Sequence, residues 1–197
     1  MTDSYFGKHH CEPRWQCHTP FSSAGASTEQ LDWLLDPSSL TRRLQLTCKG
    51  QFCVVPVSQR WKRPQLNEAQ ALGVRPHERC FIREVHLLCE NQPWVFARTV
   101  VPVRTLTGSR RRLKRLGKKP LGAVLFADPG MQRRHIEIAR LEAGYDLFES
   151  AIKPLAEKPA EIWGRRSVFF LDKKPLLVSE IFLPEIGYGG RHHKNNG

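Results

Sequence analysis

The stretch CFIREVHLLCENQPWVFARTVVP, residues 80–102, contains two apolar segments separated by Glu90-Asn91-Gln92. Both segments are rich in β-branched and aromatic residues, which favour strands. The short connection predicts an antiparallel hairpin of strands 80–89 and 93–102. Because side chains alternate between the two faces of a strand, Arg83 shares a face with Phe81, Val85, Leu87 and Cys89.

A charge of the opposite sign interrupts a second apolar strand face near the C-terminus. Segments 166–172 and 175–183 predict another hairpin, turning at Asp172-Lys173-Lys174. Glu180 lies there on one face with Leu176, Val178 and Phe182. An ionised group in an apolar layer is costly unless it is paired, hydrogen-bonded or facing a ligand. The pattern allows a buried Arg83–Glu180 salt bridge, or a pocket with a cation for a carboxylate and a carboxylate for a hydroxyl.

Other arginines near these strands could add positive charge to such a pocket. Arg98 lies on the same strand face as Trp94, Phe96 and Val100, so we consider it a possible second cation of the pocket. Arg165 and Arg166 precede the last hairpin, where surface pairing or capping of a helix C-terminus is their more common role.

The remaining segments predict short helices and one further strand. Ser27 with Gln30 three residues later forms a capping box, and a second short helix from Ser38 or Ser39 completes a helical hairpin. Residues 52–57 predict a strand, and 131–157 have helical composition. The predicted fold class is therefore α+β, a single domain with an antiparallel sheet, helices on one side and the helical hairpin as a lid over a buried pocket.

Length and charge limit the classes of function. At 197 residues with a net charge of +12 at pH 7, one basic domain is expected. Residues 104–119 hold eight Lys or Arg and no acidic residue. Without a helix-turn-helix, zinc-finger or RNP-type motif beside it, this segment is interpreted as a solvated basic loop or an element that attracts anions. We expect no nucleic-acid partner.

The cysteines and the N-terminal residues point to a cytoplasmic protein. The chain has six cysteines but no secretory signal and no apolar run of membrane-spanning length, so free thiols and no membrane span are expected. His9, His10, Cys11, Cys17 and His18 lack the paired spacing of zinc ligands, so no metal is expected. Nucleophile motifs and phosphate-binding loops do not occur either.

A series of short blocks spans most of residues 30–184. In order they are LDWLL (31–35), SLTRR (39–43), REV (83–85), PW (93–94), ARTVVP (97–102), LGK (116–118), PLG (120–122), LF (125–126), WGRRS (163–167) and PLLVSEIFLP (175–184). Taken together, they resemble the chorismate pyruvate-lyase family, the 4-hydroxybenzoate-forming enzymes of ubiquinone biosynthesis. The resemblance leaves three segments unmatched: 1–27, expected to be a flexible extension; 141–161, expected to be an insertion; and 185–197, expected to be a disordered tail. The catalytic domain is expected over 28–184.

The resemblance implies an activity and a set of site residues. The expected reaction removes the enolpyruvyl group of chorismate as pyruvate, gives 4-hydroxybenzoate, and uses no cofactor or metal. Ligand contacts carried over by position fall on Leu40, Arg83, Leu121 and Glu180, with Arg83 and Glu180 in catalysis. We expect a monomer whose partners are this substrate and product. Two other functions stay open: a non-catalytic sensor of a small aromatic acid, and a basic RNA-associated protein.

Overall fold

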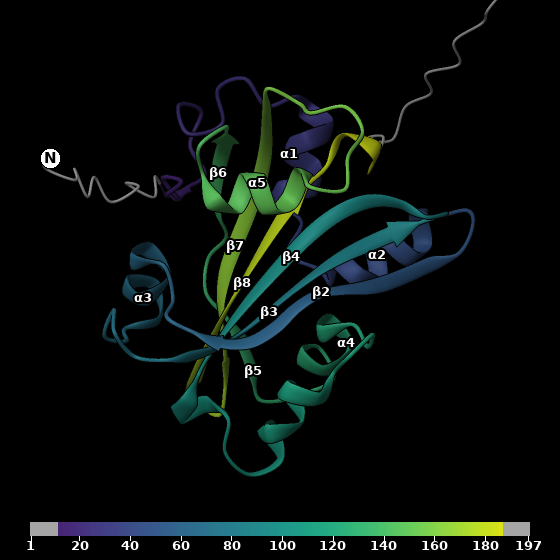
Figure 1. The fold of residues 1–197 in the computed structure, drawn as a ribbon. Coiled ribbons are helices and arrows are strands. Elements are labelled where there is room, and N and C mark those ends of the chain that lie inside the picture. Colours follow the sequence, from purple (N-terminus) through teal and green to yellow (C-terminus); the bar gives the residue numbers. More distant parts are fainter. Residues whose placement is uncertain (1–11, 187–197) are drawn as a thin grey trace, which may run out of the picture.

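An antiparallel sheet forms the centre of the molecule, which is described here from a computed structural model covering residues 12–186 (Figure 1). The sheet has eight strands in the order β1-β6-β7-β8-β4-β3-β2, with β5 pairing alongside β7. The strands are β1 (Gln16–Cys17), β2 (Phe52–Lys62), β3 (Cys80–Cys89), β4 (Gln92–Pro102), β5 (Met131–Arg133), β6 (Glu137–Glu142), β7 (Glu161–Leu171) and β8 (Lys174–Phe182). The predicted α+β class is confirmed.

Both predicted hairpins form, and their turns show why. Glu90 and Asn91 have positive φ angles of 50° and 66°, and Asp172 and Lys173 have φ angles of 46° and 64°. Two consecutive residues with positive φ match the twist of the flanking strands, which is the usual geometry of a two-residue hairpin loop. β4 then pairs with β8, so the two hairpins join into one continuous layer.

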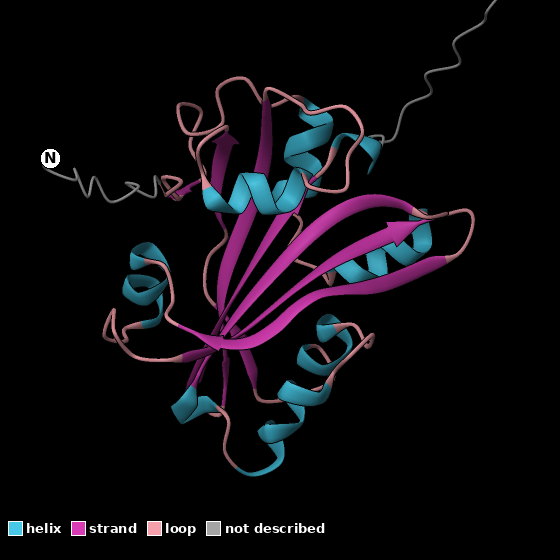
Figure 2. Cartoon of the chain, in the orientation of Figure 1, coloured by secondary structure: helices cyan, strands magenta, loops and turns pink. Residues whose placement is uncertain are grey.

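The helices are short and cover both faces of the sheet, whereas we expected them on one side (Figure 2). α1 (Thr28–Leu35), α2 (Leu40–Thr47) and α4 (Leu121–Leu125) pack against the face that carries Val85 and Val178. α3 (Leu66–Leu72) and α5 (Asp146–Ile152) pack against the opposite face, over Ile82 and Ile181. Three 3₁₀ turns complete the fold: η1 (Val103–Thr105), η2 (Gly108–Arg115) and η3 (Pro184–Ile186).

The helical hairpin before the sheet is confirmed. Ser27 accepts a hydrogen bond from the Gln30 backbone N–H, and the Gln30 side chain accepts one from the Ser27 N–H, so the capping box is complete. The buried residues Trp33 and Leu34 of α1, with Leu40 and Leu44 of α2, lie in one core cluster with Val54, Val85 and Leu87 of the sheet. The cluster also contains Trp163 of β7 and Phe182 of β8, so the hairpin packs across one face of the sheet.

The helical prediction for residues 131–157 is wrong over its first half. This segment forms β5 and β6, and only α5 is helical. β6 pairs with β7 from Glu137 opposite Arg166 to Glu142 opposite Glu161. Long-range strand pairing overrode the local helical propensity of this charged, leucine-containing stretch.

The expected extension 1–27 packs against the fold where the structure describes it. Glu12 accepts hydrogen bonds from the backbone N–H groups of Leu66 and Asn67 at 2.7 and 2.8 Å, at the start of α3. Trp15 packs against the core cluster of α5, and β1 pairs with β6. Residues 1–11, with most of the His/Cys run, and 187–197 lie outside the described residues.

The expectation of free thiols is wrong for one pair of cysteines. Cys48, at the C-terminal end of α2, forms a disulfide with Cys89, the last residue of β3. Cys17, Cys53 and Cys80 are free. Position 48 lies 41 residues from 89, and only the packing of α2 over β3 brings the two sulfurs together.

Candidate active site

All four residues implied by the family resemblance line one cavity. Arg83 on β3 and Glu180 on β8 form part of its floor, while Leu40 and Leu121, the first residues of α2 and α4, contribute to its roof. The other lining residues are Thr41, Val54, Val85, Leu87, Ala97, Thr99, Pro120, Gly122, Leu125, Phe126, Phe169 and Val178. The cavity is thus mainly apolar, with one cation and one carboxylate.

The two helices lie close together above this cavity. A Cβ atom built on Gly122 would lie only 3.0 Å from Thr41 Oγ1 and 3.2 Å from Ser39 Oγ, so glycine allows α4 to approach the start of α2. The room left inside is about 40 Å³, which is enough for a few water molecules and too small for a six-membered ring with substituents. The structure therefore shows the cavity closed.

Arg83 is a buried cation without a carboxylate partner among residues 12–186. Its side chain is held by hydrogen bonds from one Nη to the carbonyl oxygens of Gly117 and Lys119, both at 3.0 Å, and Nε has no partner. Burial lowers the pKa of Arg83 to about 10, which still leaves the group charged at neutral pH. Its charge is available to an anionic ligand group in the cavity.

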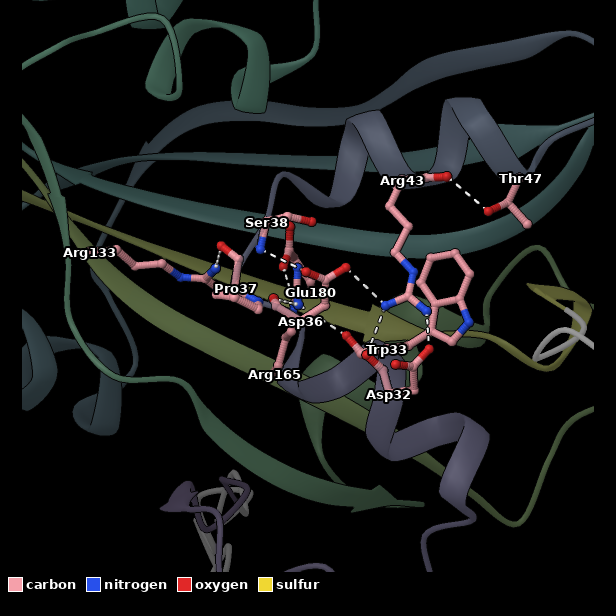
Figure 3. A network of polar contacts seen from close by, with 10 residues as sticks. All are labelled: Asp32, Trp33, Asp36, Pro37, Ser38, Arg43, Thr47, Arg133, Arg165 and Glu180. Carbon is pink, nitrogen blue, oxygen red and sulfur yellow. Dashed lines mark hydrogen bonds and ion pairs between the residues drawn. The ribbon is translucent and has the colours of Figure 1, made fainter.

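Glu180 forms an ion pair with Arg165 (Figure 3). It forms none with Arg83, so the interpretation as an Arg83–Glu180 salt bridge is wrong. Arg165 Nε donates to Glu180 Oε2 at 2.7 Å. No hydrogen bond to Oε1 forms within residues 12–186, and Glu180 lines the cavity. One carboxylate oxygen is therefore fixed by Arg165 and the other can accept a hydrogen bond from a ligand.

Arg165 connects this carboxylate to the helical hairpin, a role that the sequence analysis missed. Its Nη1 donates to the carbonyl oxygens of Trp33 and Asp36, at 3.0 and 2.6 Å, at the end of α1 (Figure 3). The side chain is 1% exposed, so the expected surface pairing is wrong, whereas these two hydrogen bonds to the end of α1 match the expected capping of a helix C-terminus. The signal was present in the pairing rule, because Arg165 lies directly opposite Glu180 in adjacent strands.

Arg98 lies on the opposite face of the sheet, so the prediction that it adds a second cation to this pocket is wrong. It pairs with Glu68 of α3 at 2.7 Å and with Glu84 of β3 at 2.5 Å. Burial opposes its charge, but the two carboxylates raise the pKa of Arg98 above its usual value. Arg98 stands opposite Glu84 in the β3–β4 register, and residues directly opposite share a face.

A larger cavity of about 530 Å³ lies beside this triad on the far face. Its buried arginine, Arg98, is already neutralised by Glu68 and Glu84, whereas Arg83 has no such partner. A buried cation without a counter-ion is the stronger signal for an anionic ligand. We therefore assign the functional site to the smaller, closed cavity.

The basic segment 104–119 approaches the same site. Leu113 of η2 and Leu116 are buried and anchor it, while Arg111, Arg112, Lys114 and Arg115 are exposed. Its last residues supply the carbonyl oxygens that hold Arg83. In the described part of the chain, no helix has the length and hydrophobicity of a membrane span, and no three His, Cys, Asp or Glu side chains are grouped as metal ligands.

Two solved structures of proteins with distant sequences have a similar fold. PhnF from Mycobacterium smegmatis superimposes with a TM-score of 0.54 at 14% identity, covering 77% of this chain and 66% of PhnF. The C-terminal domain of a histidine utilization repressor from Pseudomonas syringae pv. tomato gives a TM-score of 0.51 at 13% identity, covering 68% of this chain and 93% of that domain. At such low identity the likeness concerns the fold alone.

Sequence comparisons are far more specific. The family model described as chorismate lyase matches residues 12–189, and so begins inside the segment 1–27 for which we expected no counterpart. Proteins named probable chorismate pyruvate-lyase from Nitrosomonas europaea and Azoarcus sp. are 40% and 43% identical over 154 and 158 residues. Each alignment covers 78% of this chain, and 86% and 83% of those proteins, respectively. The resemblance in the sequence blocks is confirmed: the chain belongs to the chorismate lyase family.

Proposed function

We propose that this protein converts chorismate to 4-hydroxybenzoate and pyruvate, the first step of ubiquinone biosynthesis. The observation that carries the proposal is the closed apolar cavity. Its floor presents Arg83, which has no carboxylate partner, and Glu180, of which only one carboxylate oxygen is bonded by Arg165. Family membership and the names of the relatives support the same reaction.

In this proposal Arg83 binds the ring carboxylate of chorismate. A guanidinium offers planar, paired N–H donors that match a carboxylate, and low polarity around it strengthens the attraction. The hydrogen bonds to Gly117 and Lys119 fix the orientation of the side chain before the substrate arrives. The positive charge that costs free energy in the free protein is compensated in the complex.

Glu180 has the complementary role at the other end of the ring. Its free Oε1 accepts a hydrogen bond from the ring hydroxyl and orients the carbon that bears it, while Arg165 holds Oε2. Cleavage of the ether C–O bond and loss of hydrogen from the hydroxyl-bearing carbon make the ring aromatic. The hydrogen is transferred to the enolpyruvyl methylene carbon, so pyruvate leaves and all atoms are accounted for.

The protein then acts mainly by holding a reactive conformer and excluding water. Leu40 and Leu121 cover the ring from α2 and α4. Because the cavity in its closed form has only about 40 Å³ of room, the two helices must move apart for chorismate to enter and for the product to leave. We propose that α2 and α4 act as this lid.

The test is to mix purified protein with chorismate and to separate the products by chromatography after a short incubation. Enzyme-dependent 4-hydroxybenzoate with an equal amount of pyruvate is the expected result. A different hydroxybenzoate would overturn the assigned regiochemistry. Unchanged chorismate, in the presence of protein that melts cooperatively, would overturn the proposed activity and favour a sensor of aromatic acids.

A further inference from the structure

Seven arginine side chains are buried or half-buried in residues 12–186, and five of them have carboxylate partners. The seven are Arg43, Arg83, Arg98, Arg110, Arg133, Arg165 and Arg166. Ion pairs neutralise all of these except Arg83 and Arg133. Removing a cation from water without a counter-ion is costly, so both exceptions call for an explanation.

Arg133 of β5 is held in place by neutral groups. Nε donates to Ser167 Oγ at 3.0 Å, and Nη1 donates to the carbonyl oxygen of Pro37 at 2.9 Å, in the connection between α1 and α2. Figure 3 shows the guanidinium directed toward Pro37, on the side of the network that contains Arg165 and Glu180. Burial, and then repulsion by Arg165, lower the pKa of Arg133 to about 10, although Glu180 and Asp36 oppose the shift.

The two carboxylates that act on the charge of Arg133 already have other cationic partners. Glu180 is paired with Arg165, and Asp36 is paired with Arg43. Neither of them forms an ion pair with Arg133 within the described chain. The positive charge of Arg133 is therefore not balanced locally, in the same way as that of Arg83.

Arg133 also lies at the wall of the candidate active site. Its guanidinium carbon is 5.1 Å from the centre of the Phe169 ring, and Phe169 lines the cavity of Arg83 and Glu180. Arg133 itself lines a neighbouring, more open cavity of about 480 Å³ with Pro37 and Phe126. Phe126 lines both cavities, so Arg133 stands where the closed site borders the outer one.

We propose that Arg133 binds the enolpyruvyl carboxylate of chorismate, on the side of the site that borders the outer cavity. This inference rests on the proposed function. Chorismate carries two carboxylates, and among residues 12–186 two buried or half-buried arginines lack a carboxylate partner, the buried Arg83 and the half-buried Arg133. After C–O cleavage the second carboxylate leaves with pyruvate, and 4-hydroxybenzoate keeps only the carboxylate assigned to Arg83. Arg133 is therefore a determinant that distinguishes substrate from product.

The test compares substitutions at the two arginines with two readouts, kcat/KM for chorismate and the inhibition constant of 4-hydroxybenzoate. Arg133→Gln is expected to lower kcat/KM by about 10- to 100-fold, the range for a lost charge-assisted hydrogen bond. The inhibition constant of 4-hydroxybenzoate should change by no more than about twofold, because this product has no enolpyruvyl carboxylate to contact Arg133. Arg83→Gln is expected to lower kcat/KM for chorismate and to raise the inhibition constant of 4-hydroxybenzoate.

Arg134→Gln is the matched control. Arg134 is the exposed neighbour of Arg133 and also borders the outer cavity, but it does not line the cavity of Arg83 and Glu180, and its guanidinium stacks on Phe170 at 5.2 Å. It removes the same charge from the same strand end and should leave both readouts unchanged. Arg133→Lys keeps the positive charge and should recover part of kcat/KM, which guards against a folding defect in the Gln variant.

Equal weakening of turnover and product inhibition by Arg133→Gln would overturn the inference, because a general structural defect affects both ligands. Unchanged kcat/KM would overturn it too. Failure of the wild-type protein to consume chorismate would be a different result: it would overturn the proposed function, and this inference with it.

Discussion

Charge pairing at single residues distinguishes the candidate site from the rest of the sheet. The buried arginines Arg98, Arg165 and Arg166 each face a glutamate, and such pairs hold elements together without being available to a ligand. Arg83 and Arg133 have no such partner within residues 12–186. Glu180 belongs to both groups, since one oxygen is paired and the other faces the cavity.

Glu180→Gln should separate these two roles of the carboxylate. The amide oxygen can still accept from Arg165, which turns the amide NH₂ toward the cavity, where it cannot accept the hydrogen bond by which Glu180 orients the ring hydroxyl. We expect kcat to fall by about 10²-fold or more, the usual cost of misplacing a reacting group. The measurement is kcat by product chromatography, together with thermal unfolding of the variant.

Glu137→Gln is the control for loss of a buried pair. Glu137 accepts from Arg166 at 2.7 Å, the same distance as in the Arg165–Glu180 pair, and it does not line the cavity. Both variants should be destabilised, and only Glu180→Gln should lose turnover. Comparable kcat values for the two variants would exclude a role for Glu180 in the reaction.

At the scale of elements, helix α2 is attached at both of its ends. The connection before it is held by Arg165 through the Asp36 carbonyl and by Arg43 through the Asp36 carboxylate. Its C-terminal end is joined to β3 by the Cys48–Cys89 disulfide. A lid attached in this way can rotate or bend between its two ends, but it cannot leave the sheet as a whole.

The disulfide should contribute measurably to stability. Closing a loop with a sequence separation of 41 residues corresponds to about 4 kcal/mol in the chain-entropy model, and measured values are commonly about 2–4 kcal/mol. Cys48→Ser should lower the free energy of unfolding by this amount, as measured by urea denaturation under oxidising conditions. Reductant should lower the wild-type value to the same level.

Cys53→Ser provides the comparison, since Cys53 is a free cysteine on the neighbouring strand β2. For this variant, reductant should lower the free energy of unfolding by the same amount as for the wild type. A wild-type midpoint that does not change when reductant is added would show that the disulfide does not form in the protein in solution.

At the scale of the whole molecule, the net charge of +12 should assist the capture of a doubly negative substrate. The exposed arginines and lysines of segment 104–119 lie next to the residues that hold Arg83. Salt screens such long-range attraction, with a Debye length of about 10 Å at 0.1 M. The value of kcat/KM for chorismate should therefore fall as the salt concentration rises, while kcat at saturation changes little.

Replacing Arg111 and Arg112 by Glu should reduce this salt dependence. Both side chains are exposed, and neither lines the cavity. The comparison is the slope of kcat/KM against ionic strength for the double variant and for the wild type. Identical slopes would exclude the basic segment from substrate capture and leave it as a solvated loop.

Local sequence patterns determined much of this fold. Strand periodicity predicted the two hairpins and placed Arg83 and Glu180 on inward faces, because alternation of side chains depends only on the local backbone. Capping residues predicted α1 for the same reason. The four ligand contacts depended on the family resemblance.

Only the tertiary structure decided which charges are neutralised. Arg98 could be counted as a site cation until β3 placed Glu84, and α3 placed Glu68, beside it. Arg165 reaches Glu180 because β7 pairs with β8, and Arg133 reaches Phe169 because β5 pairs with β7. The Cys48–Cys89 bond forms because α2 packs over β3. The Arg98–Glu68, Arg133–Pro37 and Cys48–Cys89 contacts join residues that are 30, 96 and 41 positions apart in the sequence. Their formation depends on strand register and helix packing across the whole chain, which no local window of sequence contains.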